Sequence, residues 1–280
     1  MRINHNISSM ITQGALDRVT NDLGKSLERL STGLRINRSS DDAAGLSVSE
    51  NLRTQVTGMA VAKRNASDGI ALLQIAEGAA SEISSILQRM RELAVQSSND
   101  TLTSTERSYT NQEYQALLSE VDRITNVTQY NNQTLLAGGS TSFGGASSAA
   151  SILHIGPKGG STNALTISLS GTSSGAIGIN GTSIDSQSRA DSAIATIDTA
   201  INSINSIRSD LGAYVNRLEH AINNLDNQSH NMQAAESLIR DVDFANETVN
   251  FTRNQIMTQS ATAMLGQANA VPQSVLKLLS

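Results

Sequence analysis

The first thirty or so residues of the chain place apolar side chains at steps of three and four positions. Side chains at this spacing share one face of a helix and form the seam of a coiled coil. The pattern stops at Ser31-Thr32-Gly33, and residues 35–42 are rich in Asn, Ser and Asp, so we expect a hinge or spoke there. The predicted seam residues are Leu16, Val19, Leu23, Leu27, Leu30 and Leu34.

A second helical pattern begins at Ser47, with Glu50 three residues later. A Ser and a Glu at this spacing form a capping box, which satisfies two free backbone amides at a helix start. The pattern continues for about 50 residues, whereas helices of globular proteins average about 11 or 12, so this helix is typical of a rod. Its predicted seam residues are Leu52, Val56, Met59, Ala66, Ile70, Leu73, Ala80, Ile83, Leu87, Met90 and Ala94.

Another capping box, Thr103 with Glu106, predicts the start of a third helix. We expect this helix to fold back against the second one. Its predicted buried face consists of Tyr109, Tyr114, Leu117, Val121, Ile124 and Val127.

From residue 138 to about residue 189 the composition changes to Gly, Ser and Thr with very few charges. Apolar runs at 152–155, 165–169 and 177–179 predict a few short strands, and Asn180-Gly181 after the last run fits a tight hairpin turn. Full disorder of this stretch is the alternative that its composition leaves open.

The helical period then returns, more regular than before, and predicts a long helix that ends near residue 240. After Asp241-Val242-Asp243 a last helix follows, with two adjoining apolar stripes of seven-residue period. So wide an apolar face implies more than one partner helix. The long helix has its seam at Ile194, Ile197, Ile201, Ile204, Ile207, Leu211, Val215, Leu218, Ile222 and Leu225; the two stripes are Val249, Ile256, Ala263 and Ala270, and Met257, Met264, Val271 and Leu278.

These patterns predict a mainly α protein whose long antiparallel helices form a coiled-coil rod, with a small β-hairpin excursion in the middle. The last helix alone is expected to be unfolded, because ordering it costs more conformational entropy than burial of its apolar face returns. Pairing with the first helix adds burial but also a second ordering cost, so that a two-helix stem is marginal. Packing against neighbouring copies can supply the missing burial, and we therefore predict self-assembly.

The composition narrows the possible functions. There is no Trp, with only three Phe and four Tyr, which disfavours a thick core and suits thin helical contacts. The net charge of −5 offers no basic surface for phosphates, so we expect no nucleic-acid partner. The absence of Cys excludes disulfides and thiolate sites.

Membrane insertion and a secretory leader are not expected. The opening residues contain no continuous apolar region and no cleavage site of small residues, so they do not form a signal peptide. Residues 254–276 are long enough to span a membrane, but Gln and Asn side chains interrupt them and are costly in hydrocarbon. A helix buried among other protein helices explains this run better.

No pattern indicates catalysis, a cofactor or a metal site. The histidines His5, His154, His220 and His230 are far apart and have no metal-ligand spacing. A polar turn before a helix explains Asp41-Asp42 better than a pair of catalytic carboxylates does. No nucleophile or phosphate-binding motif occurs between a strand and a helix.

Several motifs resemble those of bacterial flagellin, over about 140 residues at the start of the chain and 90 at its end. They are Ile3-Asn4-His5-Asn6, Leu30-Ser31-Thr32-Gly33-Leu34-Arg35-Ile36-Asn37, Asp41-Asp42-Ala43-Ala44-Gly45-Leu46, Gln88-Arg89-Met90-Arg91-Glu92-Leu93-Ala94-Val95-Gln96-Ser97, Asp122-Arg123-Ile124, Tyr130-Asn131 and Ala268-Asn269-Ala270-Val271-Pro272-Gln273-Ser274-Val275-Leu276-Lys277-Leu278-Leu279.

The resemblance implies a subunit that polymerises into the flagellar filament for swimming motility. It implies that residues 1–46 and 241–280 form inner-tube helices, the first with a spoke, that 47–137 and 191–240 form rod helices, and that 138–190 form a thin outer surface. The polymerisation helices would order when neighbours cover Leu16, Val19, Leu23, Leu27, Leu30, Ile256, Met257, Met264, Val271 and Leu278.

The resemblance also implies partners and a location. The expected partners besides other copies are the flagellar export apparatus, a flagellin export chaperone, the filament cap and the hook-filament junction proteins, and the expected location is the extracellular filament. A vertebrate toll-like receptor recognises a patch of flagellins to which Gln88, Arg89, Leu93 and Glu113 correspond. Leu93 could instead be a core residue, and Arg89 could pair along its helix.

Two other functions share part of the pattern. A hook-filament junction protein has similar terminal helices, although the close similarity at both ends favours the filament subunit. A cytoplasmic signalling coiled-coil hairpin would need a helical tip where this chain has Gly-rich strand signals.

Overall fold

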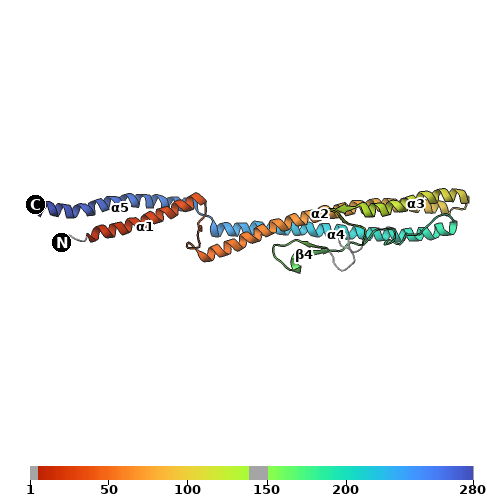
Figure 1. Cartoon of the computed structure of the whole chain (residues 1–280), viewed down its shortest axis with the longest axis horizontal. Coiled ribbons are helices and arrows are strands. Elements are labelled where there is room, and N and C mark those ends of the chain that lie inside the picture. Colours follow the sequence, from red (N-terminus) through yellow and green to blue (C-terminus); the bar gives the residue numbers. More distant parts are fainter. Residues whose placement is uncertain (1–5, 139–150, 280) are drawn as a thin grey trace. The chain divides into compact units, whose positions relative to one another are not determined.

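The computed structural model describes residues 6–138 and 151–279, the last nine of these without their side chains. The helices are α1 (Ile7–Thr32), α2 (Ala43–Ser98), α3 (Ser104–Val127), α4 (Gln187–Arg240) and α5 (Phe244–Leu279). The strands are β1 (Gln129–Tyr130), β2 (Gln133–Thr134), β3 (Ser151–His154) and β4 (Ala164–Ile167), with a short 3₁₀ helix η1 (Ser161–Asn163). The mainly α fold predicted from the sequence is confirmed (Figure 1).

The chain divides into two compact units. Unit 1 consists of residues 1–54 and 230–280, and unit 2 of residues 55–229. The helices α2 and α4 therefore contribute residues to both units. In unit 1, α1 and α5 lie side by side and antiparallel. In unit 2, α2 runs antiparallel to both α3 and α4 (Figure 1).

The core of unit 2 lies along the predicted seams of α2 and α4. Small and branched apolar side chains alternate there, which suits the close approach of long helices. Three ion pairs join the two helices at their exposed edges: Lys63 to Asp226 at 2.8 Å, Arg208 to Glu77 at 2.8 Å and Arg91 to Asp198 at 2.6 Å. Fully buried seam residues are Met59, Ala66, Leu73, Ala80, Ile83, Leu87, Met90, Ala94, Ile197, Ile204, Leu211 and Leu218.

By length and composition alone, α2 is the one helix in the described part of the chain that is apolar enough to cross a membrane. A helix in the core of a protein that spans no membrane can pass the same test. The buried side chains of α2 pack against α3, α4 and the hairpins. Packing within the described chain buries 39% of its most apolar 18-residue window.

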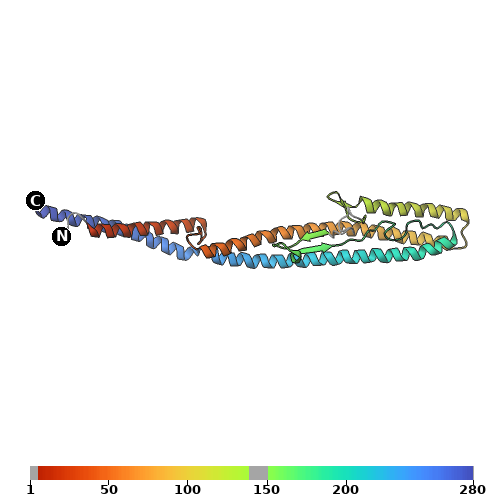
Figure 2. The same ribbon diagram turned by 60° about the horizontal axis from the view of Figure 1, so that its bottom comes forward.

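The β3–β4 hairpin packs on α2 and α4 (Figure 2). Its strands pair antiparallel with Ile152 opposite Thr166, which confirms the strands predicted at 152–155 and 165–169. Gly69 of α2 lets the hairpin approach, because a Cβ at this position would lie 2.4 Å from a methyl carbon of Leu153. Gly58 faces Pro157 of the same hairpin in a similar way.

The third predicted strand is wrong, whereas Asn180-Gly181 does form a tight turn, with the amide of Thr182 bonded to the carbonyl of Ile179 at 3.2 Å, but the turn closes no hairpin among the described residues. Residues 173–182 form successive turns instead, with the amide of Ile177 bonded to the carbonyl of Ser173 and positive φ at Gly178 and Gly181. Ile177 and Ile179 are nevertheless buried, so their apolar character reflects core contacts rather than a strand. Residues 139–150 of the predicted outer segment lie outside the described residues.

A hairpin that the pattern analysis missed, β1–β2, follows α3. Asn131 and Asn132 form its turn with φ of 49° and 62°, the conformation that a type I′ turn requires at both central positions. Two adjacent Asn residues were the signal for it, because Asn tolerates positive φ better than most residues.

The α3 capping box is confirmed, since Thr103 and Glu106 bond each other's backbone amide. Part of the buried face predicted for α3 is wrong: Tyr109 and Val127 are 65% and 58% exposed. Leu118 and Thr125 take their places beside Tyr114 and Val121, while Leu117 and Ile124 are half-buried.

The predicted start of α2 at Ser47 is also wrong. The helix begins one turn earlier, where the Asp42 carboxylate accepts the amide of Gly45 at 2.9 Å. Glu50 makes no capping box and instead pairs with Arg240 at 2.7 Å. Asp42 rather than Ser47 caps the helix, because its carboxylate accepts a backbone amide of the first turn.

Candidate functional site

The antiparallel pair of α1 and α5, here called the stem, is the most informative surface of unit 1. At one end the side chain of Asn6 donates to the carbonyl of Ala268 at 2.8 Å. At the other end the guanidinium of Arg29 lies 3.7 Å from the carboxylate of Glu247, and Glu247 is only 7% exposed. Arg29 thus compensates a carboxylate that would be costly to bury alone.

On α1 the side chains facing α5 recur at steps of three and four. One predicted member of this seam is wrong: Leu27 is 54% exposed, and Ser26, 4% exposed, takes its place. The regular spacing runs through residue 26, so the position rather than the polarity of the side chain decides which residue faces the partner helix. The seam consists of Leu16, Val19, Leu23, Ser26 and Leu30.

On α5 the residues facing α1 are largely polar or small. Asn250, Asn254 and Thr258 belong to this face, with Ala261 and Ala268, and Phe251 and Leu265 are the two large apolar side chains among them. The intramolecular seam therefore leaves most of the apolar surface of α5 unused.

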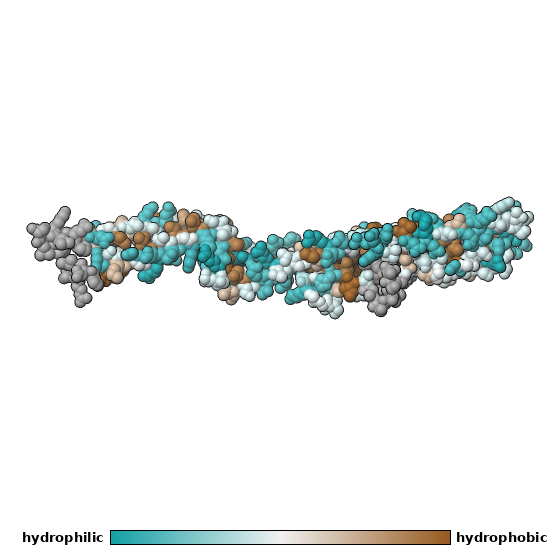
Figure 3. Space-filling view, in the orientation of Figure 1, coloured by the Kyte–Doolittle hydropathy of each residue, from teal (hydrophilic) through white to brown (hydrophobic). Residues whose placement is uncertain are grey.

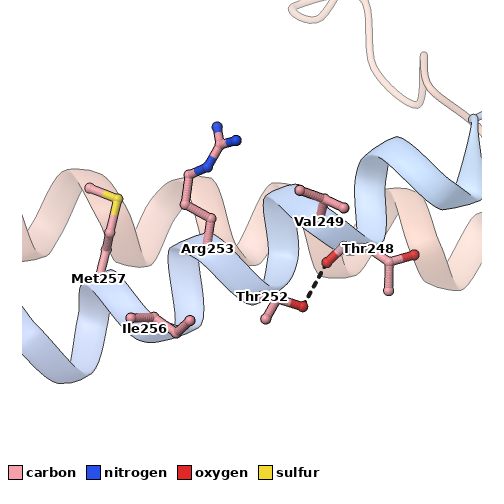
Figure 4. Close-up of a pocket in the computed structure, with 6 residues that line it drawn as sticks. All are labelled: Thr248, Val249, Thr252, Arg253, Ile256 and Met257. Carbon is pink, nitrogen blue, oxygen red and sulfur yellow. Dashed lines mark hydrogen bonds between the residues drawn. The ribbon is translucent and has the colours of Figure 1, made fainter.

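The stripe residues of α5 whose side chains are described, up to Ala270, are exposed beside α1. In the single chain Val249 and Ile256 are each 58% exposed, Met257 is 45% exposed and Met264 is 58% exposed. Figure 4 views this surface with α1 behind α5, where an open hollow of about 530 Å³ lies over Thr248, Val249, Thr252, Arg253, Ile256 and Met257. Figure 3 shows further hydrophobic residues on the surface of unit 1.

An apolar stripe of this extent on a helix indicates a site for another protein surface. Ile7, Met10 and Ile11 of α1 are likewise between 56% and 66% exposed. The side chains of two predicted polymerisation residues, Val271 and Leu278, lie outside the described residues, although both positions belong to α5.

The predicted spoke is held by main-chain bonds to the α4–α5 connection. Leu34 and Asp241 form an antiparallel bridge, with the amide of Arg35 bonded to the carbonyl of Arg240 at 2.7 Å and that of Val242 to the carbonyl of Gly33 at 3.0 Å. Ile36 fills the space beneath and is 2% exposed. This bridge connects the ends of the two stem helices.

The acidic residues around the spoke act as turn and cap residues. The backbone amide of Arg38 donates to the Asp41 carboxylate at 3.0 Å, and this bond lowers the pKa of Asp41. Asp243 accepts the amides of Ala245 and Asn246 at the start of α5, and the bond from Asn246 is the largest cause of its lowered pKa. No described group of three His, Asp or Glu side chains is arranged to hold a metal ion.

The residues that resemble a receptor-recognition patch lie on α2 and α3. Gln88, Arg89 and Glu113 are exposed, and Arg89 bonds Glu92 at 3.0 Å and Glu113 at 2.9 Å. These bonds, the one to Glu92 foremost, raise the pKa of Arg89. Leu93 is 1% exposed and belongs to the core of unit 2, beneath this surface.

Comparison with known proteins identifies the family. The bacterial flagellin N-terminal helical region matches residues 3–141, and the bacterial flagellin C-terminal helical region matches residues 194–279. This chain belongs to the bacterial flagellin family. The flagellin of Halalkalibacterium halodurans is 46% identical over the full length of both chains, and the flagellar filament 33 kDa core protein of Treponema phagedenis is 43% identical over the full length of both.

Solved structures agree on the fold. The crystal structure of Bacillus cereus flagellin has a TM-score of 0.51 at 30% identity, covering 62% of this chain and 94% of that one. A putative flagellar hook-associated protein from Vibrio parahaemolyticus has a TM-score of 0.58, but at 15% identity it shows a shared fold alone. Full-length flagellin relatives above 40% identity therefore favour a filament flagellin over a hook-filament junction protein. These relatives do not favour a signalling coiled-coil hairpin either.

Proposed function

We propose that this chain is a structural subunit of the bacterial flagellar filament and that α1 and α5 form its polymerisation surface. One observation carries the proposal: the stem uses the polar face of α5 within the chain and leaves its apolar stripes exposed. Covering these stripes with other copies removes apolar surface from water, which drives assembly.

The segments take roles consistent with the family. Residues 1–46 and 241–280 would form the inner tube, 47–137 and 191–240 the rod layer, and 138–190 the surface. The small buried core of the stem supports the first assignment, and the well-packed core of α2 with α4 supports the second. The proposal assigns no catalytic step to any residue.

Filament formation by purified protein tests the polymerisation surface. Deletion of residues 245–280 should abolish filaments seen by electron microscopy while the chain keeps strong helical circular dichroism. Met264→Glu should also abolish them, because a charge in a buried apolar contact is costly. Met264→Leu is the matched control and should polymerise, since it keeps size and polarity. Filaments from the deleted chain would refute the proposal.

The proposed export partners follow from the family and from the properties of the stem. An export chaperone would cover the exposed α5 stripes before assembly, and the export apparatus would carry the chain unfolded. The cap and the hook-filament junction proteins would lie at the two ends of the growing filament. The absence of Cys and the small core of unit 1 suit unfolding before passage. Recovery of the chain from sheared extracellular filaments tests the location, and a chain found only inside cells would contradict it.

We extend the proposal to recognition of the monomer by the vertebrate receptor for flagellin. Gln88, Arg89 and Glu113 would contact the receptor, while Leu93 would support them from the core. In a reporter assay Arg89→Ala should lower the response about tenfold, since it removes an exposed charged contact. Arg91→Ala is the matched control, because Arg91 pairs with Asp198 of α4 instead. Equal effects of both changes would contradict this assignment.

A further inference from the structure

The exposed surfaces of the stem carry several charges without an ion pair among the described residues, including Arg253 on α5, and Asp17, Asp22 and Lys25 on α1. Within residues 244–270, α5 has two charged side chains, Glu247 and Arg253. Glu247 is paired with Arg29, whereas Arg253 is exposed and has no ion pair or hydrogen bond in the described part of the chain. On α1, Asp17 is exposed and equally without a partner there.

Arg253 lies in the middle of the outward face of α5, which is otherwise apolar or small. This face follows a second seam at steps of four and three, formed by Val249, Arg253, Ile256, Ser260 and Ala263. Figure 4 shows Arg253 beside Met257 and above Ile256, projecting away from the axis of α5. Residues 249–257 contain no acidic side chain that could pair with it along the helix.

Asp17 occupies the corresponding place on α1. A second row of residues, at steps of four and three, lies on the side of α1 that faces away from α5. It consists of Met10, Gly14, Asp17, Asn21 and Gly24. A Cβ placed at Gly14 or at Gly24 would have no neighbour within 4 Å, so the single chain gives no packing reason for either glycine. The charge of Asp17 in this row is opposite in sign to that of Arg253. The adjacent Arg18 turns about 100° away and bonds the carbonyl of Gly14 at 3.1 Å.

Helix geometry places the two charges on opposite sides of the stem. Each residue turns an α-helix by about 100°, and Asp17 follows the seam residue Leu16 whereas Arg253 precedes the seam residue Asn254. The helices α1 and α5 are antiparallel. A residue that follows a seam residue on α1 and a residue that precedes a seam residue on α5 therefore lie on opposite sides of the stem. Arg253 and Asp17 of one chain therefore cannot pair with each other.

We propose that in the filament the outward face of α5 packs on the outward face of α1 in a neighbouring copy, with Arg253 paired to Asp17 of that copy. The proposal rests on the polymerisation proposed above and specifies its contact. Two different faces of the stem meet in this contact, so that each copy offers a free face to the next one. A contact of this kind produces an open helical polymer rather than a closed dimer.

Charge reversal in separate chains tests the pair. Arg253→Glu and Asp17→Arg should each raise the minimum concentration for filament formation at least about tenfold, because like charges meet at the contact. An equimolar mixture of the two variants should return within about threefold of the unchanged protein, since complementary pairs then form between alternating copies. A pair within one chain would gain nothing from mixing.

Asp22→Arg provides the matched control. Asp22 is an exposed acid of the same helix, but it precedes the seam residue Leu23 and lies on the same side of the stem as Arg253. Asp22→Arg alone should polymerise normally because it keeps Asp17 and Arg253, and in a mixture it should not draw the Arg253→Glu chain into filaments. Incorporation of Arg253→Glu together with Asp22→Arg, or no restoration by Asp17→Arg, would overturn the assignment, as would normal polymerisation of Arg253→Glu or Asp17→Arg alone. If the unchanged protein forms no filaments, the polymerisation proposal itself fails.

Discussion

At the residue scale, two glycines allow two backbone segments of unit 2 to lie close together. A Cβ at Gly171 would lie 3.1 Å from the Cα of Gly138, and the next amide, of Thr172, bonds the carbonyl of Leu136 at 2.9 Å. Any side chain at position 171 would push apart two backbone segments, which cannot rotate away as the end of a side chain can. Glycine is required here by space.

Gly171→Ala should therefore lower the free energy of unfolding by about 1–3 kcal/mol, the usual cost of overpacking. Gly175→Ala in the same loop is the matched control, because a Cβ there has no neighbour within 4 Å. It should be neutral or stabilising by about 0.5 kcal/mol, through the lower entropy of the unfolded chain. Urea unfolding followed by circular dichroism measures both, and equal stability of the two variants would contradict the contact.

At the element scale, the start of α5 depends on a charged cap. The pKa of Asp243 is lowered, mainly by its bond from the backbone amide of Asn246, so the folded pKa lies below the ordinary value of 3.8. A carboxylate with a lowered pKa stabilises the fold above the unfolded pKa, and this contribution is lost as the pH falls through the folded value. The contribution of this cap to the first turn of α5 should therefore be lost only in acid.

NMR titration of the Asn246 amide checks this cap. Its chemical shift should change with a midpoint below pH 3.8. In Asp243→Asn the cap is retained without a titrating group, because Asn caps helices about as well as Asp does. The shift in that variant should stay constant over the same range. A midpoint above 3.8 in the unchanged protein would show that the carboxylate is not stabilised by folding.

The helices could be predicted because their periodicity persists over many turns, as in the α4 seam from Ile194 to Leu225. Which of two neighbouring residues faces the partner helix could not be predicted in this way. Leu27 was preferred to Ser26 because it is apolar, yet the three-and-four spacing brings Ser26 to the seam. Ile177 and Ile179 alternate as in a strand, but Gly178 and Gly181 at positive φ allow turns that bury them equally well.

The candidate site was predictable in composition and only partly in orientation. Periodicity identified the apolar stripes of α5, and it implied several partners. It could not reveal that α1 takes the face of Asn254 and Thr258 and leaves Ile256 and Met264 exposed, because both faces can form a seam. The Leu34–Asp241 bridge was also beyond prediction, since it joins residues about 200 positions apart through backbone groups alone.

At the scale of the whole molecule, the buried core is very unevenly divided. Among the described residues of unit 1, Ile36 is the one apolar side chain classed as buried, beside Ser26, Ser49 and Glu247. All other buried apolar residues belong to unit 2. Local stability follows the number of buried apolar contacts, so the single chain should contain one stable unit and one that opens readily.

Hydrogen exchange measured by mass spectrometry should resolve this difference. In the monomer, amides of α5 between residues 247 and 268 should exchange quickly, because this helix opens readily. Those of α2 between residues 72 and 94 should exchange orders of magnitude more slowly. In filaments the α5 amides should become protected, because neighbouring copies cover Ile256, Met257 and Met264. The α2 peptides serve as the internal control, since they should change far less. If α5 is as protected in the monomer as α2, its folding does not depend on assembly, and its exposed stripes would then need another partner.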